Sequence, residues 1–403
     1  MHKMMKYSLI IVLLTGLFLS CEREISPDQA DSFIKFYGNY MLDQSGDVEV
    51  LSGGGYAICG TVTDGSVGKR MVLIVTDKYG TVQNGFPKYY SMEGFQTGGS
   101  SLIVLQGGSG GFFLSGYVEK PAGGTTSALQ KDIFVVRTSA NGEEIWHRSY
   151  GSAEDEQVLH SIERINSGYL LAGSHTRNGK SDILIMGITE EGDSAKLGLN
   201  YNNPNAVNSV ASFLLKSGNM YLCACTYDRP NNEGTGIQVL TFDDELSPLA
   251  KNLSGEFEES GMCILERSEG QFLILGNRMN TAGVSEIVLY GAETNGLLIT
   301  NSSLLATISE GNTDLTGKKV IKTAKGGLAI VGTRSAGENS EVLLQFVSST
   351  IQVGDQVSFG ASGAQTGSDI ELTRDGGYIV LGTNSYGESS MISLMKTSAT
   401  GDI

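Results

Sequence analysis

Residues 375–382 read Asp-Gly-Gly-Tyr-Ile-Val-Leu-Gly, a turn signal followed by a short apolar run that closes on glycine. Six earlier stretches have the same form, in which a glycine-bearing turn precedes an aromatic residue or leucine. The residues that open the seven apolar runs are Tyr56, Phe112, Tyr169, Tyr221, Phe272, Leu328 and Tyr378. Their spacings are 56, 57, 52, 51, 56 and 50 residues, so the chain is an array of seven similar units.

Each unit reads as four short strands. In the last unit, Ile370 and Leu372 alternate with polar residues, the run 378–383 follows the turn, and residues 390–396 form a third run. The fourth strand is clearest at residues 145–151, Ile-Trp-His-Arg-Ser-Tyr-Gly. Sustained helical periodicity is missing, and 54 glycines among 403 residues fit many tight turns. The pattern predicts an all-β protein.

The two ends of the array complement each other. Residues 33–38, Phe-Ile-Lys-Phe-Tyr-Gly, read as a fourth strand with no first, second or third strand before them. The seventh unit has three strands and then stops at Ile403. Pairing of the N-terminal strand there would remove the unprotected sheet edges of an open array. We therefore predict a seven-bladed β-propeller of four-stranded blades over residues 32–403, with its ring closed by the N-terminal strand.

The first 31 residues predict export. Lys3 and Lys6 precede an apolar stretch at residues 9–19, which is too short to span a bilayer as a helix. Leu19-Ser20-Cys21 resembles the lipobox of bacterial lipoproteins. The resemblance implies a lipoprotein signal peptide at residues 1–20, acylation of Cys21 and a lipidated tether at residues 21–31. An ordinary secretory signal that happens to end beside a cysteine is the alternative.

Acidic residues after Cys21 bear on the location. Glu22 and Glu24 flank Arg23 and resemble the acidic tag of surface-exposed lipoproteins of the Bacteroidetes type. This implies a lipid anchor in the outer membrane and exposure at the cell surface. The formal net charge is 28 − 44 = −16, so the field of the protein repels nucleic acid and anionic lipid surfaces. We expect no nucleic-acid partner.

The body of the chain, residues 32–403, resembles a family of bacterial secreted and lipoprotein propellers. The strand at residues 33–38, the turn Asp375-Gly376-Gly377-Tyr378 and the apolar strand that Asp132 opens carry the resemblance. The fourth unit departs from it, because Cys225 replaces the closing glycine. The resemblance implies the fold and says little about function, since propellers host hydrolases, lyases, lectins and scaffolds.

Cysteine and histidine give no sign of a metal site or a cofactor. Cys59, Cys223, Cys225 and Cys263 fall in predicted strands, where free buried thiols are favoured, although Cys263 could approach Cys223 or Cys225 to form a disulfide. Motifs for zinc binding, nucleophile elbows and phosphate loops are missing. A single tryptophan argues against sialidase and quinone-cofactor propellers. We therefore predict no cofactor, no metal and no catalytic residue.

The remaining candidate site is a central channel, which the first strand of each blade would line. Polar residues on these predicted strands are Asp47, Glu49, His160, Glu163, Glu266, Asp369 and Glu371. Such a ring of carboxylates suits a cation or a polar glycan. The alternative interpretation is that these residues solvate the mouths of an acidic protein. That interpretation is favoured, because no carboxylate position repeats through all seven units.

We predict a membrane-anchored binding or assembly module that is not an enzyme. Its protein or glycan partner would contact variable loops, such as residues 122–130 and 228–234, because recognition commonly lies on loops of a rigid scaffold. One alternative is a glycan-binding or glycan-degrading component of surface polysaccharide uptake. Its aromatic platform would draw on Phe95, Tyr117, Tyr227 and Tyr386. A periplasm-facing scaffold for outer-membrane assembly is a further alternative.

Overall fold

The computed structural model describes residues 32–106, 110–121, 129–152, 154–177, 179–201, 208–253, 255, 257–360 and 362–403. The described chain consists of strands and one short 3₁₀ helix, η3 (Pro230–Asn232), which confirms the predicted all-β class. None of its helices is long and apolar enough to cross a membrane. The predicted signal peptide, Cys21, the tether and most of the loop at residues 122–130 lie outside the described residues.

Five sheets of four strands follow one another along the described chain. The first sheet is β2 (Gln44–Val50), β3 (Tyr56–Asp64), β4 (Gly68–Thr76) and β5 (Lys88–Tyr90), and the second is β6 (Gln96–Val104), β7 (Phe112–Pro121), β8 (Leu129–Thr138) and β9 (Glu144–Tyr150). The third sheet is β10 (Asp155–Glu163), β11 (Tyr169–Arg177), β12 (Lys180–Ile188) and β13 (Ser194–Tyr201). The fourth is β14 (Ser209–Ser217), β15 (Met220–Asp228), β16 (Thr235–Phe242) and β17 (Leu249–Asn252), and the fifth is β18 (Glu258–Ser268), β19 (Gln271–Met279), β20 (Ser285–Asn295) and β21 (Leu298–Ile308).

The other eight strands form one hydrogen-bonded sheet. They are β22 (Asp314–Lys322), β23 (Leu328–Ala336), β24 (Asn339–Val347), β25 (Val353–Phe359), β26 (Ala364–Leu372), β27 (Tyr378–Tyr386), β28 (Ser389–Thr397) and β1 (Phe33–Met41). A single residue pair, Ser340 with Ala364, joins β24 to β26. The sheet therefore divides into a sixth unit, β22 to β25, and a seventh unit, β26 to β28 with β1.

The first strand of the chain is the outer strand of the last unit. β1 runs antiparallel to β28 from Phe33 onward. The hydroxyl of Tyr37 in β1 donates a 2.7 Å hydrogen bond to the carbonyl of Gly80, in a turn of the first sheet. Tyr90 of β5 donates the equivalent 2.7 Å bond to Gly142 in the second sheet. β1 therefore has the same place in the seventh unit that β5 has in the first sheet.

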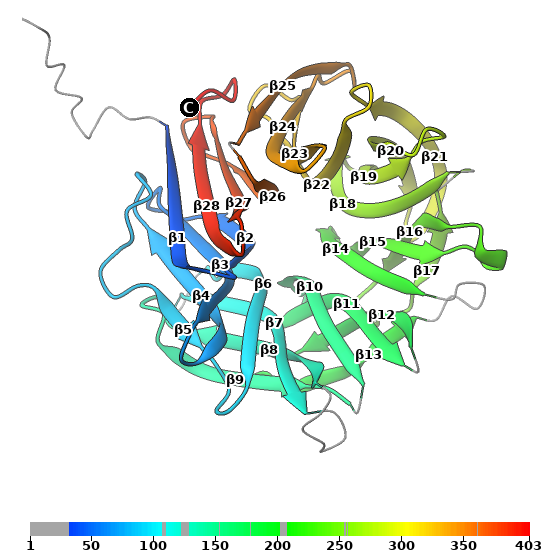
Figure 1. Ribbon diagram of the computed structural model, residues 1–403. Coiled ribbons are helices and arrows are strands. Elements are labelled where there is room, and N and C mark those ends of the chain that lie inside the picture. The colour runs from blue at the N-terminus through cyan, green and yellow to red at the C-terminus, as the bar shows by residue number, and fades with distance from the viewer. Residues whose placement is uncertain are drawn as a thin grey trace, which may run out of the picture. The chain divides into compact units, whose positions relative to one another are not determined.

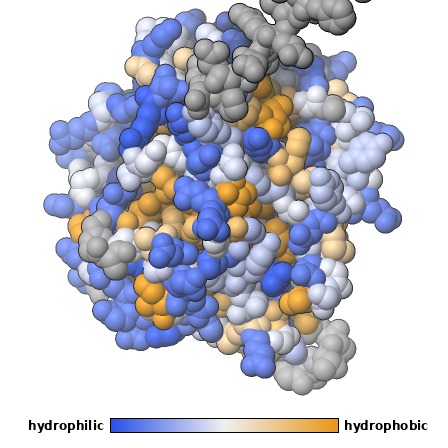
Figure 2. All heavy atoms as spheres, turned by 90° about the vertical axis from the view of Figure 1, so that its left-hand side faces the viewer, coloured by the Kyte–Doolittle hydropathy of each residue, from blue (hydrophilic) through white to orange (hydrophobic). Residues whose placement is uncertain are grey.

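Some apolar side chains of β1 reach the surface. Ile34 and Phe36 are 44% and 48% exposed. Together with Phe359 and Met395, they line a small crevice between β1 and β25. Figure 2 looks onto the side of the molecule that carries β1 and shows apolar residues interrupted by hydrophilic ones. The surface around β1 therefore combines apolar and hydrophilic residues.

The first strands of the sheets lie innermost and surround a common centre (Figure 1). Each first strand contacts the first strand of the next sheet, and β26 contacts β2. In this last contact, the N–H of Val48 donates a 2.9 Å hydrogen bond to Asp369 Oδ2. An apolar cluster that includes Val48, Ile58, Leu381 and Leu394 lies between the first sheet and the seventh unit. The two ends of the described body are thus packed against each other.

The quoted turn shows why the repeat depends on glycine. Gly376 has a φ of +81°, a conformation that side chains disfavour. A Cβ added to Gly377 would lie 2.1 Å from the carbonyl oxygen of Thr397, and one added to the closing Gly382 would lie 2.5 Å from that of Thr366. Side chains at these two positions would push β27 away from β28 and β26.

The four cysteines of the described chain are free and buried, as predicted. Cys223 and Cys225 share one face of β15, with their sulfur atoms 3.6 Å apart. Cys263 of β18 packs in another cluster, beside Leu275. In the fourth unit, Cys225 takes the place of the closing glycine and pairs with Ala211 of β14.

Candidate functional site

The first strand of each of the seven units carries a β-bulge at the same point of the repeat. The extra residues, here called the bulge residues, are Gly46, Ser100, Leu159, Ser212, Met262, Lys318 and Ser368. The next residues, here called the post-bulge residues, are Asp47, Ser101, His160, Phe213, Cys263, Lys319 and Asp369. Residues that lie far apart in the chain thus share one register position around the centre.

All seven bulge residues line one central cavity of about 510 Å³. Five post-bulge residues also line it, namely Asp47, His160, Phe213, Lys319 and Asp369. Lys69, Tyr117 and Lys131 contribute to its wall from second and third strands. The cavity therefore lies toward the end of the sheets where second strands lead into third strands. The connections that contain residues 122–130 and 228–234 start and finish at this same end.

Most post-bulge side chains form a hydrogen bond with the first strand of the next unit. In five of the seven units, the post-bulge side chain accepts a hydrogen bond from a backbone N–H of the next first strand. The bonds are Val48 N to Asp369 Oδ2 (2.9 Å), Leu102 N to Asp47 Oδ2 (2.8 Å), Ser161 N to Ser101 Oγ (3.1 Å), Leu214 N to His160 Nδ1 (3.2 Å) and Val320 N to Cys263. Because these N–H groups lie on the inner edge of a sheet, they would otherwise lack a protein partner. We call these bonds clasps.

Lys319 is the cation at the centre of the acidic part of the cavity. Its Nζ lies 2.6 Å from Asp369 Oδ1 and 2.7 Å from Glu371 Oε1. Burial acts to lower the pKa of Lys319, but the nearby carboxylates of Asp369, Glu371 and Asp47 raise it well above its ordinary value. Burial likewise acts to raise the pKa of Asp369, and the charge of Lys319 lowers it below the ordinary value. Lys319 and Asp369 are therefore both charged.

Asp47 and Glu49 of β2 lie beside the same ion pair. Burial, reinforced by the charge of Asp369, raises the pKa of Asp47 well above its ordinary value. The interaction between the Asp47 and Asp369 side chains adds to the rise in the pKa of Asp47 and helps to lower the pKa of Asp369. Burial, followed by the charge of Glu371, raises the pKa of Glu49 to about 7. Burial and the neighbouring carboxylates thus disfavour the ionised forms of Asp47 and Glu49.

His160 is held in its neutral form. Its Nδ1 accepts the clasp from Leu214, and its ring stacks on Phe213 with the ring centroids 4.0 Å apart. Burial, followed by the charge of Lys319, lowers the pKa of His160 to about 3. A base with such a pKa is a poor proton acceptor near neutrality. His160 therefore acts as a packing and clasp residue.

Lys318 projects into the cavity next to Lys319. No hydrogen bond or ion pair joins its ammonium group to any residue in the described part of the chain. Its side chain is exposed and lines the cavity beside other protein groups, which desolvate it in part. Burial therefore lowers the pKa of Lys318, and the charge of Asp369 offsets only part of this effect. Lys318 is the one charged member of the seven bulge residues.

Two residues predicted for the channel do not join this cluster. Glu163, near the end of β10, lines a separate hollow of about 570 Å³ together with Trp146 and Arg164. Glu266 of β18 lines none of the four hollows identified among the described residues. Both stand three residues after a post-bulge residue, so they point to the opposite face of their strands. The sequence assigned the strands correctly but did not distinguish the two faces.

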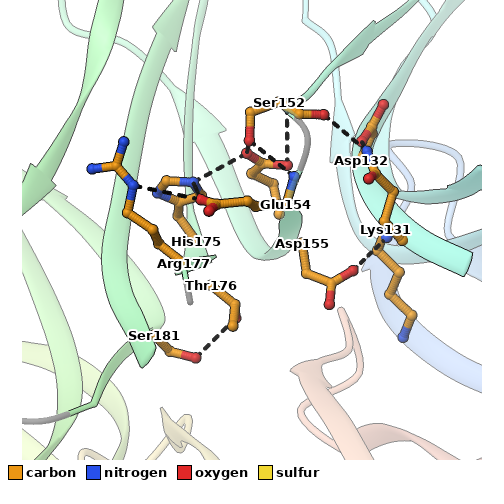
Figure 3. A network of polar contacts seen from close by, with 11 residues as sticks. Lys131, Asp132, Ser152, Glu154, Asp155, His175, Thr176, Arg177 and Ser181 are labelled. Carbon is orange, nitrogen blue, oxygen red and sulfur yellow. Dashed lines mark hydrogen bonds and ion pairs between the residues drawn. The ribbon is translucent and has the colours of Figure 1, made fainter. Parts of the chain in front are cut away.

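A polar groove of about 320 Å³ adjoins the cavity between the second and third sheets, and Lys131 and Gln157 line both. Figure 3 shows the polar network beside this groove. The backbone N–H of Lys131 donates a 2.7 Å hydrogen bond to Asp155. The ring of His175 faces Glu154, with Nε2 and Oε2 3.4 Å apart. The polar wall of the cavity therefore continues outward between these two sheets.

The four aromatic residues considered for a glycan platform do not lie together. Tyr117 lines the central cavity, with Lys131 Nζ 4.4 Å from its ring centroid. Tyr227 is buried in β15, and Phe95 packs against the core between the first and second sheets. Tyr386, at the end of β27, is 71% exposed. Of the four, Tyr117 alone can touch a molecule in the cavity.

Sequence reasoning missed Lys318 and Lys319, although a signal for them was present. Asp47, Lys319 and Asp369 each stand nine residues before the residue that opens the next apolar run, since 56 − 47, 328 − 319 and 378 − 369 all equal nine. The same count identifies the post-bulge position in five of the seven units. It fails in the second and fourth units, where the turn between the first two strands differs in length.

Glu49→Gln is expected to reduce the decrease in the free energy of unfolding that the wild type shows between acid and neutral pH. The pKa of Glu49 in the folded state is about 7, above its ordinary 4.5, so the folded chain holds this proton more tightly than the unfolded chain. The stability that this proton confers is complete below the ordinary pKa and is lost as the pH rises through about 7. The loss is at most about 3 kcal/mol, since each pKa unit corresponds to about 1.4 kcal/mol.

Thermal unfolding at several pH values measures this effect. Glutamine does not ionise, so the variant should melt above the wild type at about pH 8 and together with it at about pH 4. Glu163→Gln, which removes an exposed carboxylate from β10, is the matched control and should leave the pH profile unchanged. Parallel profiles for Glu49→Gln and the wild type would contradict the assignment.

No protein-family model matches the sequence, and no curated protein matches it either. Extracellular domains 1–2 of Drosophila Semaphorin 1a are similar in structure, with a TM-score of 0.55 at 10% identity over 91% of this chain and 88% of that chain. An α-L-arabinanase of Penicillium chrysogenum, complexed with arabinobiose, gives a TM-score of 0.49 at 12% identity over 92% and 99%. A Dyadobacter fermentans protein of unknown function gives 0.48 at 11% identity over 90% and 98%. The first likeness shows a shared propeller-type fold alone, and nothing further is concluded from the other two.

Proposed function

We propose that this chain is a lipoprotein anchored in an outer membrane through Cys21 and exposed at the cell surface, and that it acts there as a non-catalytic binding module. The lipobox-like Leu19-Ser20-Cys21 supports the lipid anchor, because a small residue precedes the cysteine directly after an apolar stretch. Glu22 and Glu24 support exposure at the surface.

The scaffold of the proposed module is a closed propeller of seven blades. Seven four-stranded units result when the eight-stranded sheet is divided at the Ser340–Ala364 pair. The pairing of β1 with β28 and the contact of β26 with β2 support closure of the ring. The clasp from Val48 to Asp369 repeats, between the last unit and the first sheet, a bond that joins other neighbouring sheets. A closed ring would hold the central cavity in a fixed shape.

The central cavity is the observation that carries the binding function. Every unit contributes a bulge residue to it, and its volume of about 510 Å³ falls within the range of about 300–1,000 Å³ that small-molecule sites occupy. Its wall combines a hydroxyl at Ser212, an ammonium group at Lys318 and an aromatic ring at Tyr117. A small polar ligand fits this combination.

The ionisable groups of the cavity favour binding without turnover. Asp47 and Asp369 accept backbone N–H groups of neighbouring sheets. Glu371 pairs with Lys319 at 2.7 Å, and His160 is neutral. Acid–base hydrolysis of a glycoside needs two carboxyl groups that face the scissile bond from opposite sides. The carboxyl groups here face Lys319 and the strand edges instead.

A saccharide-binding component of a surface polysaccharide uptake system is the second candidate function. The polar groove of about 320 Å³ that continues from the cavity past Lys131 and Gln157 favours it, because an extended sugar chain needs more length than the cavity alone offers. Tyr117 lines the cavity beside Lys131, which lines both spaces.

Ser212→Trp tests whether the cavity is the binding site. A tryptophan at this bulge position would occupy the cavity while the clasps stay in place. Saccharide fragments of the host surface are expected to raise the melting temperature of the wild type and of the surface control Ser349→Trp, but not that of Ser212→Trp. Crosslinking of the acylated protein in native membranes gives the opposing outcome. A stoichiometric protein partner captured equally by the wild type and by both variants would contradict the cavity as the site and favour an assembly role.

A further inference from the structure

Lys318 and Lys131 are the two lysines of the central cavity without an ion pair among the described residues, and Lys131 instead places its Nζ 4.4 Å from the ring centroid of Tyr117. Lys319 beside it pairs with Asp369 at 2.6 Å, and Lys69 on the cavity wall lies 3.6 Å from Glu119. Lys318 has no such partner among the described residues. The whole chain has a formal charge of −16, so an unpaired cation at its centre stands out against the overall balance.

An unpaired ammonium group on a cavity wall can be stabilised by an anion that enters the cavity. The side chain of Lys318 is exposed to the cavity, and the nearby protein groups lower its pKa through partial desolvation. A carboxylate within hydrogen-bonding distance would reverse this effect through a charge-assisted bond. Low-dielectric walls also concentrate the field of a cation inside a cleft, which favours the entry of an anion.

The neighbouring bulge residues suit the rest of a sugar. The hydroxyl of Ser212 has no hydrogen-bond partner among the described residues, and Ser100 and Ser368 bring further hydroxyls to the same cavity. Leu159 and Met262 add apolar surface, which suits the C–H faces of a sugar ring. The bulge residues therefore combine one cation, several hydroxyls and two apolar contacts around a single space.

We infer that the bulge residues form a binding site for a carboxylate-bearing saccharide, whose carboxylate lies on Lys318 and whose hydroxyls contact Ser212 and the other serines. The inference rests on the proposed function of the cavity as a ligand site and adds the chemical class of the ligand. Inorganic phosphate has a suitable charge, but it makes no use of Leu159 and Met262. The experiment must therefore distinguish the binding of phosphate from the binding of a carboxylate-bearing saccharide.

The experiment is isothermal titration calorimetry of the mature full chain with a disaccharide of galacturonic acid, the matched neutral galactose disaccharide and inorganic phosphate. The acidic disaccharide should bind the wild type most tightly. Lys318→Met should weaken its binding about 10- to 100-fold, the effect of one charge-assisted hydrogen bond. Lys318→Arg should retain part of the affinity, and the surface control Lys325→Met should retain all of it. Added salt should weaken binding to the wild type more than to Lys318→Met.

The outcomes separate this inference from the proposed function. The neutral and acidic disaccharides could bind the wild type equally, and both could fail to bind Ser212→Trp. This result would overturn the preference for a carboxylate-bearing saccharide and keep the cavity as the binding site. Acidic-disaccharide binding unaffected by Ser212→Trp and by Lys318→Met would overturn both proposals. Tighter binding of phosphate than of the disaccharide would overturn the saccharide class. Lys318→Met should fold like the wild type, because Lys318 makes no ion pair or hydrogen bond with the described residues.

Discussion

A chain that begins at residue 42 is expected to lose the cooperative unfolding transition of a chain that begins at residue 32. The shorter chain lacks β1, so β28 becomes an open sheet edge. It also lacks Phe33 and Tyr37, which pack against the cluster between the first sheet and the seventh unit. Two aromatic side chains at about 2 kcal/mol each and several backbone hydrogen bonds at about 1 kcal/mol each predict a loss of about 5 kcal/mol or more in the free energy of unfolding.

Urea unfolding followed by tyrosine fluorescence and by circular dichroism measures this loss. A peptide of residues 32–42, added in excess, should restore part of the stability of the shorter chain, because it can pair with β28 as β1 does. The chain that begins at residue 32 is the control, since it retains the whole strand. If both chains unfold at the same urea concentration, β1 does not close the ring.

Lys319→Met is expected to lower the free energy of unfolding by about 3–5 kcal/mol at about pH 8, the effect of removing one partner of a buried ion pair. The substitution leaves Asp369 and Glu371 without the cation that lies 2.6 and 2.7 Å from them. Their pKa values in the folded variant should therefore rise above those of the unfolded chain. Stability conferred by a raised carboxyl pKa is present at acid pH and is lost as the pH rises. The difference from the wild type should consequently shrink at about pH 4.

Two further variants separate this effect from a simple change of size. Lys325→Met replaces an exposed lysine in a turn and should leave stability unchanged. The triple variant Lys319→Met, Asp369→Asn, Glu371→Gln removes all three charges and should recover much of the loss, because no buried carboxylate is left unpaired. A destabilisation of Lys319→Met that is the same at about pH 4 and about pH 8 would show that packing, and not charge, is responsible.

The strands could be predicted from the sequence because each is encoded locally. The Asp375-Gly376-Gly377 turn needs glycine where β27 approaches β28, and this requirement recurs in most units at a nearly constant spacing. The pairing of residues 33–38 with the last unit could also be anticipated, since both halves of one four-stranded pattern are visible at the two ends. The continuation of β1 to Met41 could not, because its last residues follow a register shift.

The site could be predicted only in part because its chemistry depends on residues from different units. Asp369 was recognised as a polar residue of a first strand, but its cation, Lys319, lies 50 residues earlier in the sequence. Their meeting depends on the bulge that brings both into one register. The pKa of Asp47 is raised by burial and then by the charge of Asp369, from the opposite end of the chain. Local patterns contain neither the pairing of the sheets nor the burial that sets these charges.

At each bulge, two adjacent residues have different structural roles. The post-bulge residues bind neighbouring strands, whereas the bulge residues take no part in the ladder and face the cavity. Three bulge residues also contribute to the fold: a Cβ at Gly46 would lie 2.9 Å from the carbonyl oxygen of Gly99, and the hydroxyls of Ser100 and Ser368 bond Val158 and Ser45 of neighbouring units. The other four, Leu159, Ser212, Met262 and Lys318, line the cavity without such bonds, so substitutions there should change the ligand preference more than the stability of the fold. The ligand preference and the stability of the fold can therefore change independently at these positions.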